Sequence, residues 1–287
     1  MSALRFGTAG WSFADWSGLF YPKSAAETPL AYYARYFNCA EVNVTFYRPP
    51  GAKIAAGWVK QVAGRDFVFA VKASQEFTHT GAAGAAEARG FLEGIAPLAE
   101  AGRLGPILLQ FPWSFRNTPG TRDRVARLAE GFAGRETAVE FRHASWDTAE
   151  ARDQVRSLGL AWVNIDQPAL RDCLAPSEHV TAETAYLRLH GRAADKWFAK
   201  EIEPHERYDY YYSAAELDPW VDRIRRMMAA AKAVYVIGNN HYRGKAPANT
   251  LQLKARIQGG RVAVPEPLIG AFPELAEIAE KPAGRLF

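Results

Sequence analysis

The sequence has few cysteines and no long apolar run. Its 287 residues include only Cys39 and Cys173, which are too few for a disulfide framework, and no Cys/His cluster has the spacing of a zinc site. No apolar run approaches the ~20 residues needed to cross a bilayer, and the first residues lack the basic and apolar segments of an export signal. We therefore expect a cytoplasmic protein with no membrane partner and no cofactor.

Charge of one sign is not in large excess either. The chain has 35 Lys and Arg against 31 Asp and Glu, a net charge of +4, with a pI near 9.0. This mild excess allows an anionic substrate without requiring nucleic acid. The apolar content of 48% is too high for a disordered chain and sufficient for a large core.

Eight short strand-like runs recur along the chain, with helical stretches between them. They begin at Leu4, Ala40, Phe67, Pro106, Thr137, Ala161, Ala185 and Ala233. Alternating strands and helices predict parallel strands joined by right-handed crossovers. Eight such units in a chain of this length predict an α/β fold, a TIM (β/α)8 barrel formed as a single domain by residues 1–287. The alternative is an open doubly wound sheet, but no G-x-G-x-x-G follows the first run.

Several helix ends can be read from the sequence. Ser213 with Glu216, and Asp147 with Glu150, predict capping boxes at two helix starts. Pro119 suits a first helical turn, and Gly159 suits a helix end.

The polar residues of the strands can be assigned to one face. Side chains alternate across a strand, and the faces that touch the helices of a βα barrel must be apolar. We therefore place the polar face of each run in the barrel interior, with its last residues at the C-terminal mouth, where TIM-barrel enzymes build their sites. We interpret Glu41 and Asn43, deeper in their strand, as structural. The residues predicted at or near the mouth are Lys72, Gln110, Glu140, Arg142, Asp166, Arg188, His190 and Asn240.

Several segments together resemble the YecE-like family, a domain family of unknown function. They are "GTAGWSFADWSGLFYP", "VNVTFYRPP", "FAVKAS", "LLQFPWSF", "VEFRHASW", "YLRLHGR", "RYDYYYS" and "NNHYRGKAPANTLQL". The resemblance covers nearly the whole chain and implies a TIM barrel, but it implies no reaction. In "VIGNNH", Gly238 stands where we expect a bulky apolar or aromatic residue.

Three cations suggest an anion site. Lys72, Arg142 and Arg188 should converge at the mouth, and guanidinium groups bind carboxylate or phosphate in a bidentate manner. Lys245 lies in the loop after the eighth strand, near a helix start, where TIM barrels often bind phosphate. Gln110, Asn240, Trp11 and Tyr47 complete the predicted substrate-binding set.

Glu140, Asp166 and His190 are the predicted catalytic proton carriers. The same three side chains could instead hold a divalent metal, although three nearby cations would oppose it electrostatically. Lys72 could form a Schiff base, because burial among cations lowers a lysine pKa. Glu140 nearby makes an ion pair or an anion contact the favoured role for Lys72.

Three functions compete. The leading hypothesis is an enzyme, a hydrolase, lyase or isomerase, that acts by acid/base chemistry on a small phosphorylated or carboxylated, sugar-like molecule. A nucleic-acid-binding or processing protein is the second, because the pI is basic and aromatic residues are frequent in the loops after the first and seventh strands. A non-catalytic small-ligand-binding barrel is the third, since binding and catalysis use the same residue types.

Overall fold

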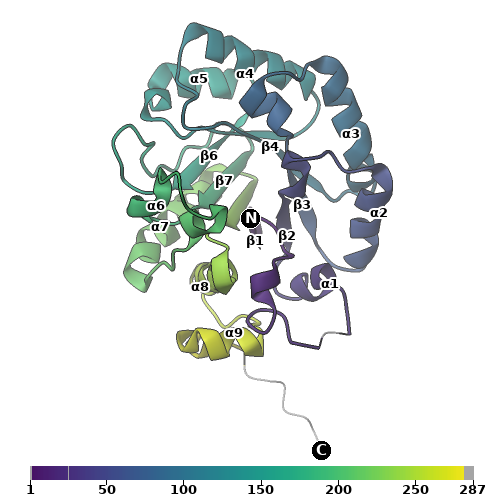
Figure 1. The fold of residues 1–287 in the computed structure, drawn as a ribbon, viewed down its shortest axis with the longest axis vertical. Helices are drawn as coiled ribbons and strands as arrows, with labels where there is room; N and C mark the ends of the chain where they lie inside the picture. The colour runs from purple at the N-terminus through teal and green to yellow at the C-terminus, as the bar shows by residue number, and fades with distance from the viewer. Residues whose placement is uncertain (1, 25, 281–287) are drawn as a thin grey trace, which may run out of the picture.

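The computed structural model of the chain describes residues 2–24 and 26–280. The predicted domain also includes residues 1, 25 and 281–287, which lie outside the described residues. Eight parallel strands surround the barrel axis (Figure 1). They are β1 (Ala3–Thr8), β2 (Cys39–Val42), β3 (Val68–Lys72), β4 (Leu104–Gln110), β5 (Thr137–Glu140), β6 (Ala161–Asp166), β7 (Thr184–Leu189) and β8 (Ala233–Gly238).

The helices form the outer layer, and Figure 1 shows α2 to α5 wrapped around one half of the strands. In the described part of the chain they are α1 (Pro29–Tyr33), α2 (Ala52–Gln61), α3 (Ala85–Glu100), α4 (Pro119–Gly131), α5 (Ala149–Ser157), α6 (Ala194–Trp197), α7 (Ala214–Ala230), α8 (Lys245–Gln258) and α9 (Glu266–Ala271). Within the described ranges, no helix is long and apolar enough to cross a membrane.

The strands close into a barrel. Their order is β1-β8-β7-β6-β5-β4-β3-β2, and a parallel bridge between Ala9 and Glu41 joins the first strand to the second. At this seam a Cβ on Gly7 would lie 2.2 Å from the Cys39 carbonyl oxygen, so only glycine allows the close approach. The TIM-barrel prediction is confirmed, and the doubly wound sheet is excluded.

One crossover departs from the predicted alternation of strands and helices. Between β6 and β7 the described residues contain no helix, and an irregular segment covers the outer face of β6 instead. Asn164 points outward into it: its Nδ2 donates to the His179 carbonyl (3.0 Å), and its Oδ1 accepts from Ser177 Oγ and His179 N–H. An irregular segment carries backbone polar groups that need partners, so a polar residue faces outward here.

The helix ends mostly follow the sequence. The Ser213–Glu216 capping box, Pro119 at the first position of α4, and Gly159 with a positive φ of 67° after α5 are confirmed. The capping box predicted at Asp147 is wrong by one residue, because the N-cap of α5 is Thr148, whose side chain accepts from Ala151 N–H. Asp147 forms an ion pair with Arg152 instead.

Gly238, the last residue of β8, is explained by helix packing. A Cβ at this position would lie 2.6 Å from Thr250 Oγ1 and 3.1 Å from the Ala246 Cβ. Both residues belong to α8, so a bulky side chain would push this helix away from the barrel. The unexpected glycine therefore fixes how closely α8 approaches the sheet.

Candidate functional site at the barrel mouth

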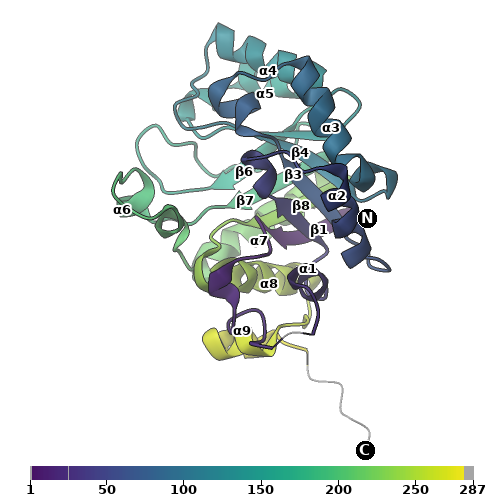
Figure 2. The same cartoon turned by 45° about the vertical axis from the view of Figure 1, so that its right-hand side comes forward.

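A cavity of about 1030 Å³ opens at the C-terminal ends of the strands. Its walls come from the strand ends and from the long connection after β7, which carries α6 and projects from the barrel in Figure 2. The lining residues are Phe13, Asn43, Phe46, Tyr47, Lys72, His79, Gln110, Pro112, Trp113, Arg142, Arg188, Trp197, Phe198, Ala199, Lys200, His205, Arg207, Tyr208, Asn239 and His241.

Glu140 lies beneath the cavity floor and is fully buried. Arg142 Nε donates to its Oε1 (2.5 Å), and Arg188 Nη1 donates to its Oε2 (2.6 Å). Burial raises the pKa of this carboxyl, but the two guanidinium groups outweigh burial and hold the pKa well below its usual range. Glu140 therefore stays ionised at neutral pH, and its position suits a brace for the two arginines better than a proton carrier.

Arg188 connects two acids across the barrel. Its Nη2 donates to Glu41 Oε1 (2.6 Å), and the Tyr186 hydroxyl donates to Glu41 Oε2 (2.9 Å). Two carboxylates and the two guanidiniums of Arg142 and Arg188 thus form a buried network with no net charge. The structural role predicted for Glu41 agrees with this arrangement.

His190 belongs to the same network. Asn239 Nδ2 (2.8 Å) and Arg142 Nη2 (3.4 Å) both point at its Nδ1, so this nitrogen is the acceptor. Its Nε2 then carries the proton and faces Glu140 Oε1 at 3.4 Å. Burial, together with the charge of Arg142, lowers the pKa of His190 to about 3, so the ring is neutral at pH 7. It is not among the residues that line the cavity.

Lys72 ends β3 and lines the cavity. Its Nζ lies 4.0 Å from the centre of the Phe46 ring. Among the residues that the structure describes, no carboxylate oxygen lies within 4.0 Å of this nitrogen, because both interior glutamates are taken by arginines. The ion pair expected between Lys72 and Glu140 is therefore absent.

Asp166 does not face the mouth, and its predicted place there is wrong. Its register partner on β7 is Leu189, which lies on the outer face of the sheet, one residue out of phase with Arg188. The buried carboxylate accepts from Arg192 Nη2 (2.6 Å), the Tyr212 hydroxyl (2.9 Å) and Trp220 Nε1 (2.7 Å). Both of its oxygens already accept hydrogen bonds on the side away from the cavity. Because Trp220 belongs to α7, Asp166 joins the barrel to this helix.

Asn240 is also displaced from its predicted role. Its Nδ2 donates to the Tyr210 carbonyl and to Asn249 Oδ1, both at 2.9 Å, on the outer side of β8. The neighbouring Asn239 faces inward and lines the cavity. The prediction was wrong by one residue. Because successive side chains point to opposite faces, this shift places Asn240 on the outer face and Asn239 on the inner one.

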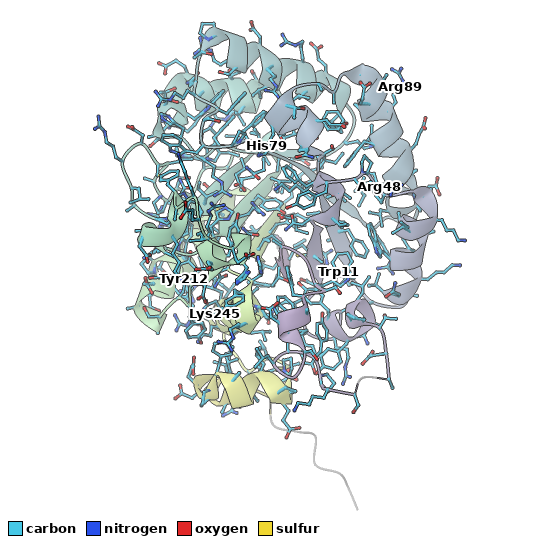
Figure 3. The ribbon with its side chains drawn as sticks, in the orientation of Figure 1. Trp11, Arg48, His79, Arg89, Tyr212 and Lys245 are labelled. Carbon is cyan, nitrogen blue, oxygen red and sulfur yellow. The ribbon has the colours of Figure 1, made fainter. Side chains whose placement is uncertain are left out.

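Two other predicted contacts lie outside the cavity. Figure 3 shows Trp11 on the side of α1 and Lys245 on the side of α8. Trp11 packs edge-on against Trp58 and Phe69. Lys245 forms an ion pair with Asp209, so its amine already has an anionic partner. Neither residue lines the cavity.

The remaining predicted residues come together at the cavity wall: Lys72, Gln110, Arg142, Arg188 and Tyr47 all line it. Tyr47 is 76% exposed at the edge. The run that begins at Ala40 is extended only to Val42. A 3₁₀ turn, Val44–Phe46, then brings Phe46 into the cavity.

Sequence reasoning missed several lining residues, chiefly His79, Lys200, Arg207 and Trp113. They lie in loops or short turns, where neither strand parity nor helical spacing applies. One signal was available for Lys200 and Arg207, because the loop after β7 is long and rich in charged and aromatic residues, and long loops in compact domains are often functional.

The charged residues of the cavity wall are all basic. Among the described residues that line it are five cations, Lys72, Arg142, Arg188, Lys200 and Arg207, and no Asp or Glu. In the whole described part of the chain, cavity included, no three His, Cys, Asp or Glu side chains are placed to hold a metal ion. The predicted triad of Glu140, Asp166 and His190 is split between the two faces of the sheet. The arrangement favours an anionic ligand.

Comparison with known proteins identifies the family of this chain. The family model described as "Protein of unknown function DUF72" matches residues 5–269. The chain belongs to the DUF72 family. It is 28% identical to the UPF0759 protein YunF of Bacillus subtilis, over 87% of this chain and 93% of that protein.

Solved DUF72 structures share the barrel. A family member from Thermotoga maritima is 34% identical with a TM-score of 0.81, covering 89% of this chain and 99% of its own. One from Enterococcus faecalis is 26% identical with a TM-score of 0.81, covering 89% and 95%. The family description names no activity, so function must be argued from the cavity.

Proposed function

We propose that this DUF72 protein is an enzyme that binds a small anionic molecule in the mouth cavity and acts on it by acid/base chemistry. The observation that carries the proposal is the cavity wall, which has five cations and, among its described lining residues, no carboxylate. Glu140 and Glu41 already balance Arg142 and Arg188 from beneath the wall. The other three cations have no carboxylate within 4.0 Å among the described residues, so they remain free to attract a phosphate or carboxylate group.

The shape of the site favours a small molecule over nucleic acid. A concave space of about 1030 Å³ lies at the upper end of the range for small-molecule pockets. Trp113, Trp197 and Tyr208 add apolar walls that suit a carbon skeleton, such as a sugar derivative, next to the anionic group. The ligand class is therefore a phosphorylated or carboxylated small molecule.

Calorimetric titration with inorganic phosphate and with pyruvate tests the binding part. The double variant Lys200→Gln, Arg207→Gln removes two loop cations from the wall but leaves the interior network intact. Each lost charged hydrogen bond should weaken binding about tenfold or more.

The matched control is Lys60→Gln, Arg89→Gln, which removes two exposed cations from α2 and α3, outside the cavity; Figure 3 shows Arg89 at the outer edge of the barrel. It should change affinity less than about twofold, since distant exposed charges are screened. Equal affinity loss in both double variants would contradict a specific anion site. Turnover of a panel of phosphorylated and carboxylated metabolites, followed by NMR, tests the catalytic part.

A further inference from the structure

Lys72 differs from every other charged group in the barrel interior because it has no ionic partner. It ends β3 at the cavity wall, and in the described part of the chain its Nζ makes no hydrogen bond and has no carboxylate within 4.0 Å. The nearest recorded partner of this nitrogen is the Phe46 ring, 4.0 Å from its centre. Phe46 lines the same cavity, so the amine and the ring lie together at its wall.

The neighbouring acids cannot easily shift to Lys72. Glu140 holds Arg142 and Arg188, and Glu41 holds Arg188 and the Tyr186 hydroxyl. The two acids and two arginines already balance each other. If a carboxylate oxygen moved away from either guanidinium to reach Lys72, it would leave a buried arginine charge unpaired. Lys72 therefore stands beside a closed network as a surplus cation.

This environment favours the neutral amine. Burial, followed by the charge of Arg188, lowers the pKa of Lys72 to about 7. About half of the Lys72 amines would then be neutral at pH 7, against roughly one in 2,500 for a lysine with the usual pKa of about 10.4. A neutral amine has a free lone pair and is a nucleophile.

We propose that Lys72 forms a covalent imine with a small oxo acid bound in the mouth cavity. This inference rests on the proposed function, because it takes the anion to be held by the cationic wall. The ammonium first loses a proton to solvent, and the neutral Nζ attacks the carbonyl carbon, so that a C–N bond forms and the C=O π electrons move to the oxygen. One proton then moves from nitrogen to oxygen and gives the carbinolamine. The nitrogen lone pair expels the hydroxyl group, which takes up a proton from solvent and leaves as water, so an ammonium and a carbonyl yield an iminium and one water.

The wall supplies the partners that such a substrate needs. Arg142 Nη1 makes no hydrogen bond with any described residue, so it can bind the carboxylate of the oxo acid. Asn43 lines the same cavity, and its buried Oδ1 has no partner among the described residues. This amide oxygen can accept a hydrogen bond from the hydroxyl group of the addition product.

Reductive trapping tests the proposal. The whole protein is incubated with pyruvate and sodium cyanoborohydride at several pH values, and the adduct is located by peptide mass spectrometry. We expect one reduced pyruvate per chain, on Lys72, with a rate that rises through about pH 7 and then levels. Acetone, which has the carbonyl but no carboxylate, should react at least about tenfold more slowly, since it lacks the charged contact.

Two conservative variants complete the experiment. Lys72→Arg keeps the charge and removes the nucleophile, so the adduct should disappear. Lys254→Arg changes another partly buried lysine with a lowered pKa, held by the Tyr36 carbonyl outside the cavity, and the adduct on Lys72 should persist. An adduct spread equally over exposed lysines, or none on Lys72, overturns the imine.

The two proposals fail in different ways. Calorimetric titration of Lys72→Arg with pyruvate measures anion binding alone. If pyruvate binds but is never trapped, the imine is wrong and the anion site stands. If pyruvate binds to neither the variant nor the native protein, the proposed function itself fails for carboxylates.

Discussion

The two sides of the barrel mouth treat their buried charges differently. On the β5 and β7 side, Glu140 is matched by Arg142 and Arg188 at 2.5 and 2.6 Å. On the β3 side, Lys72 has no acid within 4.0 Å among the described residues. Buried ions with complete sets of partners hold strands together, whereas a half-buried ion without an ionic partner has a shifted pKa and unused hydrogen-bond donors. The matched side therefore fits a structural role, and the unmatched side is where we propose the chemistry.

The largest expected effect is on the matched side. Arg188→Met should leave buried Glu41 with only the Tyr186 hydroxyl and buried Glu140 with only one arginine, and so lower the free energy of unfolding by about 3–5 kcal/mol. Urea denaturation measures this loss. The exposed pair Arg226–Glu178 (2.7 Å) provides a control, since Arg226→Met should cost less than about 1 kcal/mol. Similar losses in the two variants would mean that the interior network is no brace.

Asp166 should behave as a second structural acid, on the outer face of the sheet. Asp166→Asn replaces an acceptor with a donor in front of Arg192, Tyr212 and Trp220, and should cost about 2–3 kcal/mol of unfolding free energy. The affinity of the folded protein for phosphate should not change, because Asp166 lies outside the cavity. Normal stability combined with lost turnover would restore the catalytic role predicted from the sequence.

The pH dependence of stability should reveal His190. Its pKa in the folded protein, about 3, lies below its usual 6.5. The unfolded chain therefore binds a proton that the folded chain does not, and stability falls as the pH drops below about 6.5. At pH 5 the loss from this residue is about 2 kcal/mol relative to pH 8.

Denaturation of the native protein and of His190→Gln across pH 8 to 5 isolates this contribution, because the other histidines act equally in both proteins. Glu140 plays no part in this range, since its depressed pKa matters only below its unfolded value of about 4.3. Parallel stability curves for the two proteins would show that His190 is not buried in neutral form.

The smallest effect should come from Lys245. Its half-buried ion pair with Asp209 lies outside the cavity, so Lys245→Gln should change stability by less than about 1 kcal/mol. Phosphate affinity should change less than about twofold. A tenfold loss of phosphate affinity would support the phosphate loop that the sequence suggested.

The sequence predicted the barrel and one face of most strands correctly. Period-two alternation is reliable where an apolar helix covers a strand, and Lys72, Gln110, Glu140 and Arg188 all face inward as expected. The rule failed on β6, where Asn164 satisfies the backbone of an irregular covering segment. It could not succeed there, since it assumed that a helix covers every strand.

Pairing among the polar groups could not be predicted from the sequence. Parity placed Glu140 near Lys72, Arg142 and Arg188. The partners that Glu140 binds depend on two distances that parity does not give, 2.5 Å to Arg142 on the same segment and 2.6 Å to Arg188 on another strand. Loop residues such as Arg207 and Lys200 are also outside the reach of periodicity. Both limits concern the site, because the site is built from strand ends and loops.

The titration of Lys72 tests most directly whether this residue is an unpaired amine with a lowered pKa at the barrel mouth. Its titration can be followed directly by NMR of the protein after reductive methylation of its lysines with ¹³C-formaldehyde, with the Lys72 signal assigned by its absence in Lys72→Arg. We expect a midpoint near pH 7 for this signal, while the signals of the exposed lysines should titrate near their usual value. A Lys72 midpoint close to the usual lysine value of about 10.4 would contradict this expectation.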